Sequence, residues 1–460
     1  MTKNIDQAQT EARAYAQTLG EEKSIWFKMA PLIDADNPME VLIRTSEKYG
    51  GCVPINLRSE KIYLLSDVDH IRHVLVGNVD NYIKYFDGLK PIFGKAMITV
   101  DGALWQKIRK PQQPFFHPKQ YAEYLPYLLV AVRSKVADWA EFASTGETVE
   151  LLEQTWGMAA DMICRAFFDR EMPFNPHIVF NAVKAYTEVA NHRSIRLKKV
   201  EGSLKEVGED EAPAKAIGAW LTLPEAVIGA RAWQNREKTL LNMLLAAEAD
   251  PSMPEFDRQQ VMDEMKQYLW AGTETTALTL AWGLYLLSQH PEVAEQVRLE
   301  GRQVYGEREP TWEDIQNLTY TRSVMLEILR LYPPVWALIR TAVGEDELGG
   351  HRIMPGDRIV MSSYVVHHSP KHWSDPEAFR PERFEPGAIK KRVKYSYLPF
   401  GAGKRFCLGG QMAQLEVVLA LTMLLRRFRP EYLGNVPAKI DATVTLVPKG
   451  GLPFRFHELS

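Results

Sequence analysis

The sequence predicts a mostly α-helical protein with a small β portion. Three observations lead to this fold class. Helical patterns dominate the chain from Asp67 to about Ser288. One very long helix is predicted from about Glu255 to Leu287. Alternating patterns typical of strands are short, and they lie towards the two ends of the chain.

The first half of the chain shows three further segments. Met1–Lys23 is polar and helix-like, and it lacks the apolar core of a signal peptide. Cys52–Ser66 alternates like two short strands around a polar turn. Asn191–Lys215 is dense in both charge signs, which favours a solvated connection between helices over a patch that binds nucleic acid.

The second half begins where the long helix ends, before Pro291, which cannot continue it. Short strands follow, most clearly over His351–Val366. A last helix is predicted after Cys407. The chain finishes with a hairpin-like pair of strands around Gly450 and Gly451.

Composition favours a soluble protein of a reducing compartment, and we expect the cytoplasm. Hydrophobic residues are 46% of the chain and charged residues 25%, and the net charge of −3 favours no nucleic acid. Three cysteines cannot form a disulfide framework. The apolar stretches Tyr268–Leu287 and Val417–Leu425 are predicted to be buried helices, so we expect no transmembrane anchor. With no repeat and no linker, residues 1–460 are expected to form one domain.

Cys407 stands in the glycine-rich segment Phe400–Gly410. A phosphate-binding loop is excluded, because Gly403 lacks the partner glycine and the hydroxyl residue at the required spacings. A dinucleotide-binding turn is excluded, because Phe406 takes the place of its last glycine. The helix start after Cys407 and the neighbouring cations favour a thiolate. A soft thiolate ligand in an apolar pocket suits an iron porphyrin.

The segment resembles the haem-ligand signature of the cytochrome P-450 superfamily, Phe-x-x-Gly-x-Arg-x-Cys-x-Gly. Phe400, Gly403, Arg405, Cys407 and Gly409 fill its fixed places. The resemblance implies that Cys407 is the axial ligand of haem b (iron protoporphyrin IX) and that the other four residues help to bind it. It also implies the cytochrome P-450 fold, in which long helices surround the haem and a small β region flanks them.

A second motif is the pair Glu327 and Arg330, which by itself is usually a surface ion pair. Here it precedes Leu-Tyr-Pro-Pro and is followed by Phe379–Phe384, which contains Arg383. These segments resemble the Glu-x-x-Arg helix and the meander arginine of the same superfamily. The resemblance implies a structural triad of Glu327, Arg330 and Arg383 that holds the Cys407 loop.

A third motif, Ala271–Thr276, lies in the middle of the long helix. Its small residues could simply allow another helix to pack closely, and Gly272 could loosen the helix and leave room for water. Neither explains Glu274 in an uncharged stretch, because burial of an unused acid is costly. The segment resembles the oxygen-activation motif of the superfamily, which implies that Glu274 and Thr275 form its catalytic acid–alcohol pair.

Haem propionates need cations, and the resemblance supplies candidates. Trp105 and Arg109 match the Trp-x-x-x-Arg helix of the superfamily, and Arg340 matches the arginine beyond Glu-x-x-Arg. Arg405 is the third cation. Each of these arginines alone is more often a surface residue.

The substrate chamber is also placed by resemblance. Its expected lining is largely aromatic and aliphatic, and it comprises Tyr85, Phe86, Leu89, Phe93, Leu269, Ala271, Val335, Trp336, Leu338 and Leu452. Such a lining favours an apolar substrate, for example a fatty acid, a terpenoid or a polyketide. A substrate carboxylate could meet His192, Arg193 or Arg196, although exposed surface positions explain these residues equally well.

The activity implied is that of a haem-thiolate monooxygenase, which inserts one atom of O2 into a C–H bond and releases the other as water. A peroxygenase, isomerase or dehydratase would share Cys407, but it often lacks the acid–alcohol pair. A haem sensor without catalysis would need neither the pair nor a chamber.

Electrons are expected from a separate ferredoxin, flavodoxin or flavoprotein reductase, since no segment for a flavin or an iron–sulfur cluster is evident. Lys390–Arg405 carries six cations, which suit an acidic donor or simply form a solvated face. Cys52 and Cys164 match no ligand pattern and are expected to be core thiols.

Overall fold

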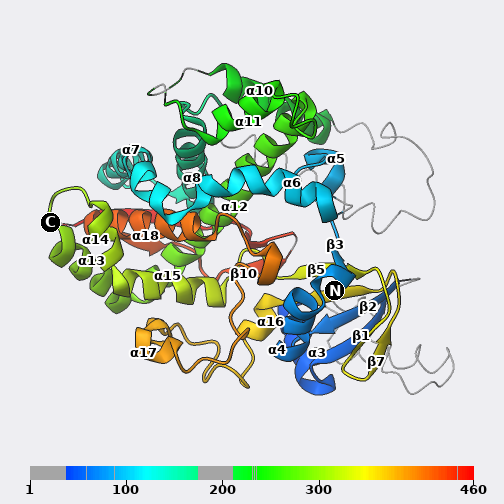
Figure 1. Cartoon of the computed structure of the whole chain (residues 1–460). Helices are drawn as coiled ribbons and strands as arrows, with labels where there is room; N and C mark the ends of the chain where they lie inside the picture. Colours follow the sequence, from blue (N-terminus) through cyan, green and yellow to red (C-terminus); the bar gives the residue numbers. More distant parts are fainter. Residues whose placement is uncertain are drawn as a thin grey trace. The chain divides into compact units, whose positions relative to one another are not determined.

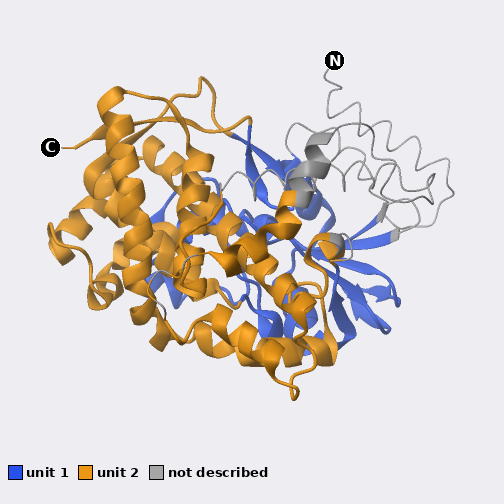
Figure 2. Ribbon diagram, turned by 90° about the horizontal axis from the view of Figure 1, so that it is seen from above, with its two compact units in different colours: residues 1–85, 326–407, 439–449 blue, residues 86–325, 408–438, 450–460 orange. Residues whose placement is uncertain are grey.

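The computed structural model describes residues 38–57, 60–86, 89–174, 211–230, 232, 234, 236–442 and 444–459. These residues form two compact units (Figure 2). Unit 1 comprises residues 1–85, 326–407 and 439–449, and unit 2 comprises residues 86–325, 408–438 and 450–460. His192, Arg193 and Arg196 lie outside the described residues.

Unit 2 is mostly helical (Figure 1). Its helices are α5 (Lys90–Phe93), α6 (Gly102–Gln112), α7 (Pro118–Thr145), α8 (Leu151–Phe168), α10 (Glu211–Gly229), α11 (Leu240–Ala249), α12 (Arg258–Gln289), α13 (Pro291–Tyr305), α14 (Trp312–Asn317) and α18 (Gly410–Arg427). The 3₁₀ turn η4 (Gln113–Phe116) follows α6, and α15 (Thr319–Leu331) begins in unit 2 and ends in unit 1.

Unit 1 combines short helices with most of the strands. Its helical segments are α3 (Pro38–Tyr49), α4 (Val68–Arg72), the π-helical turn η1 (His73–Gly77), η2 (Val79–Asn81), α16 (Ser363–His367), η6 (Pro381–Phe384), α17 (Pro386–Ile389) and η7 (Gly403–Arg405). Its strands are β1 (Cys52–Leu57), β2 (Glu60–Leu65), β3 (Tyr82–Lys84), β5 (Leu338–Ala342), β6 (Asp346–Leu348), β7 (His351–Ile353), β8 (Arg358–Met361), β10 (Lys439–Ala442) and β11 (Leu446–Lys449).

The main sheet of unit 1 has the order β1-β2-β8-β5-β3, and only the β2–β8 pair is parallel. Two-stranded ribbons β6–β7 and β10–β11 complete the β structure of this unit. In unit 2, β4 (Val149–Glu150), β12 (Pro453–Glu458) and β9 (Phe428–Tyr432) form a three-stranded antiparallel sheet. Apolar side chains cover both faces of the main sheet, among them Tyr63, Ile359, Val53 and Leu64.

Helix α12 is the core of unit 2, where it packs against α8, α18 and α10. The Asp257 side chain caps its first turn by accepting the Gln260 amide at 2.8 Å. It ends at Gln289 because Pro291 starts the next helix, α13. The predicted long helix is therefore confirmed, as are the two strands predicted within Cys52–Ser66. No helix among the described residues is both long and apolar enough to cross a membrane.

Two strand predictions are wrong. The end of His351–Val366 forms helix α16, because the Ser362 hydroxyl caps it by accepting the Val365 amide at 3.2 Å. The strands around Gly450 and Gly451 do not pair with each other: β11 pairs with β10, whereas β12 pairs with β9 and β4. At the start of β12, β4 pairs with Pro453 and Phe454 while β9 pairs on the other side from Phe454 onwards, so the part of β12 nearest to Gly451 has no free edge for a hairpin.

Candidate active site

The loop that carries Cys407 belongs to unit 1 and is closed by a backbone hydrogen bond. The Cys407 amide donates to the Phe400 carbonyl at 3.0 Å. Between them, Gly401 and Gly403 adopt φ angles of 72° and 70°, which favour glycine. A Cβ atom on Gly403 would lie 2.2 Å from the Leu75 carbonyl oxygen, so this position also lacks the space for a side chain. The glycine therefore lets the loop approach η1 closely.

The three cysteines differ in exposure, and only Cys407 is exposed. Burial, together with Asp67, raises the pKa of the Cys52 thiol to about 12. Burial also raises the pKa of the Cys164 thiol. Both are confirmed as core thiols. An accessible thiol on a tightly turned loop has the chemistry of a group that would hold a haem iron.

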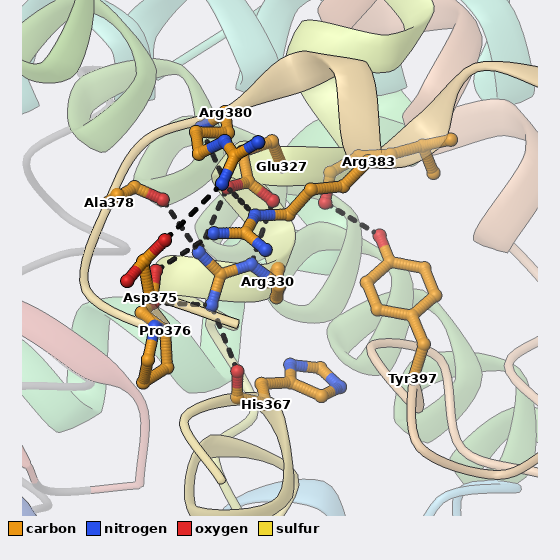
Figure 3. Close-up of polar contacts among 10 residues, drawn as sticks. Glu327, Arg330, His367, Asp375, Pro376, Ala378, Arg380, Arg383 and Tyr397 are labelled. Carbon is orange, nitrogen blue, oxygen red and sulfur yellow. Dashed lines mark hydrogen bonds and ion pairs between the residues drawn. The ribbon is translucent and has the colours of Figure 1, made fainter. Parts of the chain in front are cut away.

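Glu327 and Arg330 form a fully buried ion pair in unit 1 (Figure 3). The Arg330 guanidinium donates from Nε to Glu327 Oε2 at 2.7 Å and from Nη2 to Oε1 at 2.9 Å. The Arg383 Nε atom lies 3.3 Å from Glu327 Oε1. The backbone amide of Arg380 adds a hydrogen bond to the same oxygen at 2.9 Å. The structure thus brings the three predicted residues together and surrounds the carboxylate with donors.

The same guanidinium also binds three backbone carbonyls. Arg330 donates to the carbonyls of His367 at 2.9 Å, Pro376 at 2.7 Å and Ala378 at 3.1 Å (Figure 3). A planar guanidinium has five N–H donors, and this arrangement uses all of them on Glu327 and these carbonyls. The pair consequently ties α15 to the end of α16 and to the segment between α16 and η6.

Sequence reasoning missed His367, whose buried ring lies next to this cluster. Its Nε2 atom accepts the Leu398 amide at 2.8 Å, and its ring stacks on Tyr397 with centroids 5.1 Å apart. Burial lowers the pKa of His367 well below its ordinary value. The only sequence signal is a histidine pair directly after the apolar run that ends at Val366.

Glu274 and Thr275 lie in unit 2, in an unbroken part of α12. Glu274 is 4% exposed, and Thr275 is half-buried. The Thr275 hydroxyl donates to the Ala271 carbonyl one turn earlier at 2.8 Å, and the Thr275 carbonyl accepts the Thr279 hydroxyl at 2.7 Å. The first of these bonds fixes the orientation of the Thr275 side chain on the helix, and the second does the same for Thr279.

Gly272 has a packing role in the structure. A Cβ atom there would lie 2.6 Å from Ile163 Cδ1 of α8, so the glycine allows the two helices to approach closely. Close packing at Gly272 is therefore confirmed, and α12 continues through this position without a break. On the same helix, the Thr276 hydroxyl donates to Glu416 of α18 at 2.9 Å. Glu416 was missed, although an acid inside the apolar stretch after Cys407 is a recognisable signal.

The predicted propionate partners are divided between the units. In unit 2, Trp105 is buried on α6 and the Arg109 guanidinium lies 5.1 Å from its ring centroid. In unit 1, Arg340 is 5% exposed on β5 and donates to the Ile339 carbonyl at 2.9 Å. Arg405 is half-buried in η7.

The predicted lining residues are also divided between the units. In unit 1, Tyr85, Trp336 and Leu338 are half-buried and Val335 is exposed. In unit 2, Phe86 and Ala271 are half-buried, and Leu89, Phe93, Leu269 and Leu452 are buried. Phe93 packs between Trp220 and Trp270, with ring centroids at 5.9 Å and 4.8 Å.

The basic segment Lys390–Arg405 is less uniform than its sequence suggests. The Arg392 guanidinium lies over the rings of Phe384 and Tyr397, at 4.4 Å and 4.9 Å from their centroids. Lys404 forms an exposed ion pair with Asp80 at 3.0 Å. The exposed cations without such roles are Lys390, Lys391 and Lys394, and the exposed apolar side chains Ile389 and Val393 lie among them in the sequence.

Comparisons with known proteins give one consistent result. The chain matches the family model of cytochrome P450 over residues 20–453. It is 32% identical to the chloroplastic protein LUTEIN DEFICIENT 5 of Arabidopsis thaliana over 429 residues, which cover 88% of this chain and 71% of that protein. It is 28% identical to the cyclooctat-9-en-7-ol 5-monooxygenase of Streptomyces melanosporofaciens over 383 residues, which cover 83% of each.

A solved structure gives the same result for the fold. The chain resembles the haem domain of a cytochrome P450DA mutant with a TM-score of 0.80 and 22% sequence identity. The match covers 93% of this chain and 94% of that one. The predicted fold is therefore confirmed.

Proposed function

The chain belongs to the cytochrome P450 family and is an oxidoreductase, and we propose that it inserts one atom of O2 into a C–H bond of an apolar substrate. The other oxygen atom leaves as water, with two electrons from a separate protein and two protons. The observation that carries this proposal is the exposed Cys407 thiol on its glycine loop. The bound cofactor, haem b, supplies the activation of O2 and the oxygen transfer.

The roles proposed for this chain begin with cofactor binding. The Cys407 sulfur would hold the iron, and Phe400 would shield the sulfur from water. Arg109, Arg340 and Arg405 offer cations to the propionates, and such charge-assisted bonds orient a planar group strongly.

Thr275 and Glu274 are proposed to manage protons. The Thr275 hydroxyl gives its hydrogen to the Ala271 carbonyl, so its oxygen is left as an acceptor for a water molecule. Glu274 is 4% exposed, so its carboxyl group can pass protons inwards while bulk water stays outside. A proton supply of this kind supports the proposal of a monooxygenase over an isomerase or a haem sensor, which need no proton delivery.

The proposed substrate is a fatty acid, a terpenoid or a polyketide-like molecule. The support is the apolar chemistry of the predicted lining, which consists of aromatic and aliphatic side chains such as Phe93, Leu269 and Trp336. One relative is named as a monooxygenase of cyclooctat-9-en-7-ol. Binding spectra across fatty acids, terpenes and steroids would identify the class.

The proposed electron donor is an acidic ferredoxin, flavodoxin or flavoprotein reductase in the cytoplasm. Lys390, Lys391 and Lys394 are exposed and give it a basic docking surface. Reduction rates should fall as salt rises, because screening weakens such contacts. Rates that ignore ionic strength would remove this electrostatic argument.

Two variants test the proposed activity. The purified protein should show a red-shifted Soret band in its reduced carbon monoxide complex, and Cys407→Ala should lose both this band and oxygenation. Thr275→Ala should keep haem and substrate binding, because only one hydroxyl and one methyl group are lost. It should form less product per reduced cofactor consumed and more hydrogen peroxide. Unchanged coupling, with haem and substrate binding verified, would refute the assignment of Thr275.

A further inference from the structure

We propose that His367 is a positioning residue, which links the Glu327–Arg330 ion pair to the loop that presents Cys407. The inference rests on the proposed function, since it concerns the geometry of the haem-ligating thiolate. It assigns to one buried imidazole a connection that the ion pair does not make itself. None of the hydrogen bonds of Arg330 described above reaches the segment between Leu398 and Cys407.

The first link fixes the backbone of His367. Arg330 Nη1 donates to the His367 carbonyl at 2.9 Å, and the same nitrogen donates to the Pro376 carbonyl at 2.7 Å (Figure 3). The guanidinium is itself held by both oxygens of Glu327. Because Arg330 and Glu327 are fully buried, this link is protected from water.

The second link leaves from the ring. His367 Nε2 accepts the amide hydrogen of Leu398 at 2.8 Å, although the two residues lie in segments far apart in the sequence. Leu398 is 5% exposed, so its amide would be buried without this acceptor. A buried amide that loses its only acceptor destabilises the fold, so this hydrogen bond holds Leu398 in place.

The third link lies within the loop. The Leu398 carbonyl accepts the Gly401 amide at 3.1 Å, and the Phe400 carbonyl accepts the Cys407 amide at 3.0 Å. The ring of His367 therefore anchors the first residue of a short hydrogen-bonded loop, and Cys407 closes its other end. We expect a displacement of Leu398 to be transmitted along this short loop to Cys407.

The environment selects the neutral ring with its proton on Nδ1. Nε2 acts as an acceptor, and a second proton there would face the Leu398 amide hydrogen. Burial is the main cause that lowers the pKa of His367, and His368, Arg330 and Arg392 add electrostatic repulsion. Tyr397 fixes the plane of the His367 ring, because the two rings stack on each other. The Tyr397 ring is itself held by its hydroxyl, which donates to the Leu326 carbonyl at 2.8 Å. The ring is thus fixed in plane, tautomer and charge.

If His367 only filled space in the core, it would need no nitrogen that accepts a hydrogen bond. Nδ1 of His367 has no hydrogen-bond partner among the described residues, so one of its two nitrogens is buried at a cost. An aliphatic side chain would avoid that cost. The acceptor at Nε2 is therefore the feature of His367 that the loop uses.

The test is a set of three variants of the haem-loaded full chain. In His367→Gln the side-chain oxygen reaches the place of Nε2 and can accept the Leu398 amide. In His367→Asn the shorter amide reaches only the place of Nδ1. The control is His368→Asn, because His368 is also buried, at 3% exposed, but among the described residues its ring hydrogen-bonds to the Tyr364 carbonyl of the adjoining helix α16, at 2.9 Å, and to no residue of the Cys407 loop.

The readout is the fraction of the reduced carbon monoxide complex that has the red-shifted Soret band, per haem bound. His367→Asn should lower this fraction several-fold, whereas His367→Gln and His368→Asn should keep it near the wild-type value. Hydrogen exchange of the peptide that contains Leu398 should accelerate at least tenfold in His367→Asn alone.

Two results would overturn the inference. One is an unchanged band and unchanged exchange in His367→Asn. The other is an equal loss of the red-shifted band in all three variants, which would show a general effect of packing. This result counts even if His367→Asn binds little haem, because the band is measured per haem bound. A wild-type protein without the red-shifted band would instead refute the proposed function, so the two failures are distinguishable.

Discussion

Glu327 in unit 1 and Glu264 in unit 2 are both completely buried, yet they meet different partners. Glu327 lies between two guanidinium groups, those of Arg330 and Arg383. Glu264 has no cation beside its oxygens among the described residues, and it accepts hydrogen bonds from neutral amides. Opposite charges hold a carboxylate in its ionised form, whereas burial with neutral donors favours the protonated acid. The two regions therefore use the same residue type in different ways.

Glu264 fixes a turn of unit 2 to helix α12. Its Oε1 atom accepts the Met97 amide at 2.6 Å and the Gln260 side chain at 2.9 Å, and its Oε2 atom accepts Gln112 of α6 at 2.9 Å. The neighbouring Asp263 accepts the Lys95 amide at 2.8 Å. Burial raises the pKa of Glu264 to about 7 in spite of these bonds.

Glu416 of α18 is the extreme case of a buried acid with few partners. It is 1% exposed, and its only hydrogen bond among the described residues is the one from Thr276. Burial raises its pKa to about 8, and the Thr276 hydroxyl lowers it only in part. Glu327, Glu264 and Glu416 thus differ in the number and charge of their partners. We expect the stability lost on substitution by glutamine to fall in that order, and the three variants test this order.

Glu327→Gln should have the largest effect. It removes the charge shared by the buried Arg330 and the partly buried Arg383, and loss of one partner of a buried ion pair costs about 3–5 kcal/mol. The glutamine NH2 group would also face guanidinium donors. The measurement is the denaturant midpoint of the haem-loaded protein, together with its haem content.

The matched control is Glu345→Gln, because Glu345 pairs with Arg352 in the same unit but both side chains are exposed, by 58% and 72%. Such surface pairs contribute little to stability. If the two variants lost the same stability, burial of the ion pair would not matter, and the comparison drawn above would be wrong.

Sequence patterns predicted elements whose signal is local. The alternation in Cys52–Ser66 and the long apolar run before Pro291 each contain their own start and stop, and the structure confirms both. The pairing of β12 could not be predicted in this way, because it depends on β9 and β4, which lie far away in the sequence. Likewise, α16 begins through a serine cap that an alternating pattern conceals.

The residues of the candidate site also fall into those that a local motif locates and those that only the fold brings together. Cys407, Glu327 and Arg330 stand in motifs with fixed spacing, so the sequence locates them. His367 and Glu264 act on backbone amides of distant segments, those of Leu398 and Met97, and these contacts exist only after folding. The sequence indicates such residues only by a polar side chain that stands without explanation in an apolar stretch.

Glu264→Gln should have an intermediate effect. The new side chain keeps an oxygen for the Met97 amide, but its NH2 group meets the NH2 group of Gln112, which already donates to the Ile108 carbonyl. An unsatisfied buried donor costs about 1–3 kcal/mol. Hydrogen exchange in Gly94–Thr99 should accelerate, because the turn loses part of its attachment.

The pH dependence sharpens this prediction. The pKa of Glu264 is raised from 4.5 to about 7 on folding, so the wild type loses stability as pH rises through this range. The variant has no such group, and its deficit should therefore be largest near the lower pKa and shrink towards the upper one. Gln259→Ala is the control, because its exposed side chain bonds to Asp263 on the same helix. A deficit that does not change with pH would show that Glu264 is not a protonated acid.

Glu416→Gln should have the smallest effect, and its sign should be opposite. Glutamine is a close mimic of the protonated acid, and its oxygen can still accept the Thr276 hydroxyl, which can rotate to suit either partner. Near the ordinary carboxyl pKa of 4.5 the variant should unfold at the same denaturant concentration as the wild type.

As pH rises from there to about 8, the unfolded wild type releases its proton while the folded protein retains it, so the wild type loses stability. This loss is at most about 1.4 kcal/mol per pH unit. The variant has no such loss of stability with pH. Its stability relative to the wild type should therefore increase up to about pH 8 and then stay constant. Unfolding curves of both proteins across this range measure the difference directly. A constant difference, or a variant that is less stable throughout, would mean that Glu416 has an ionised role and belongs with Glu327 in the comparison.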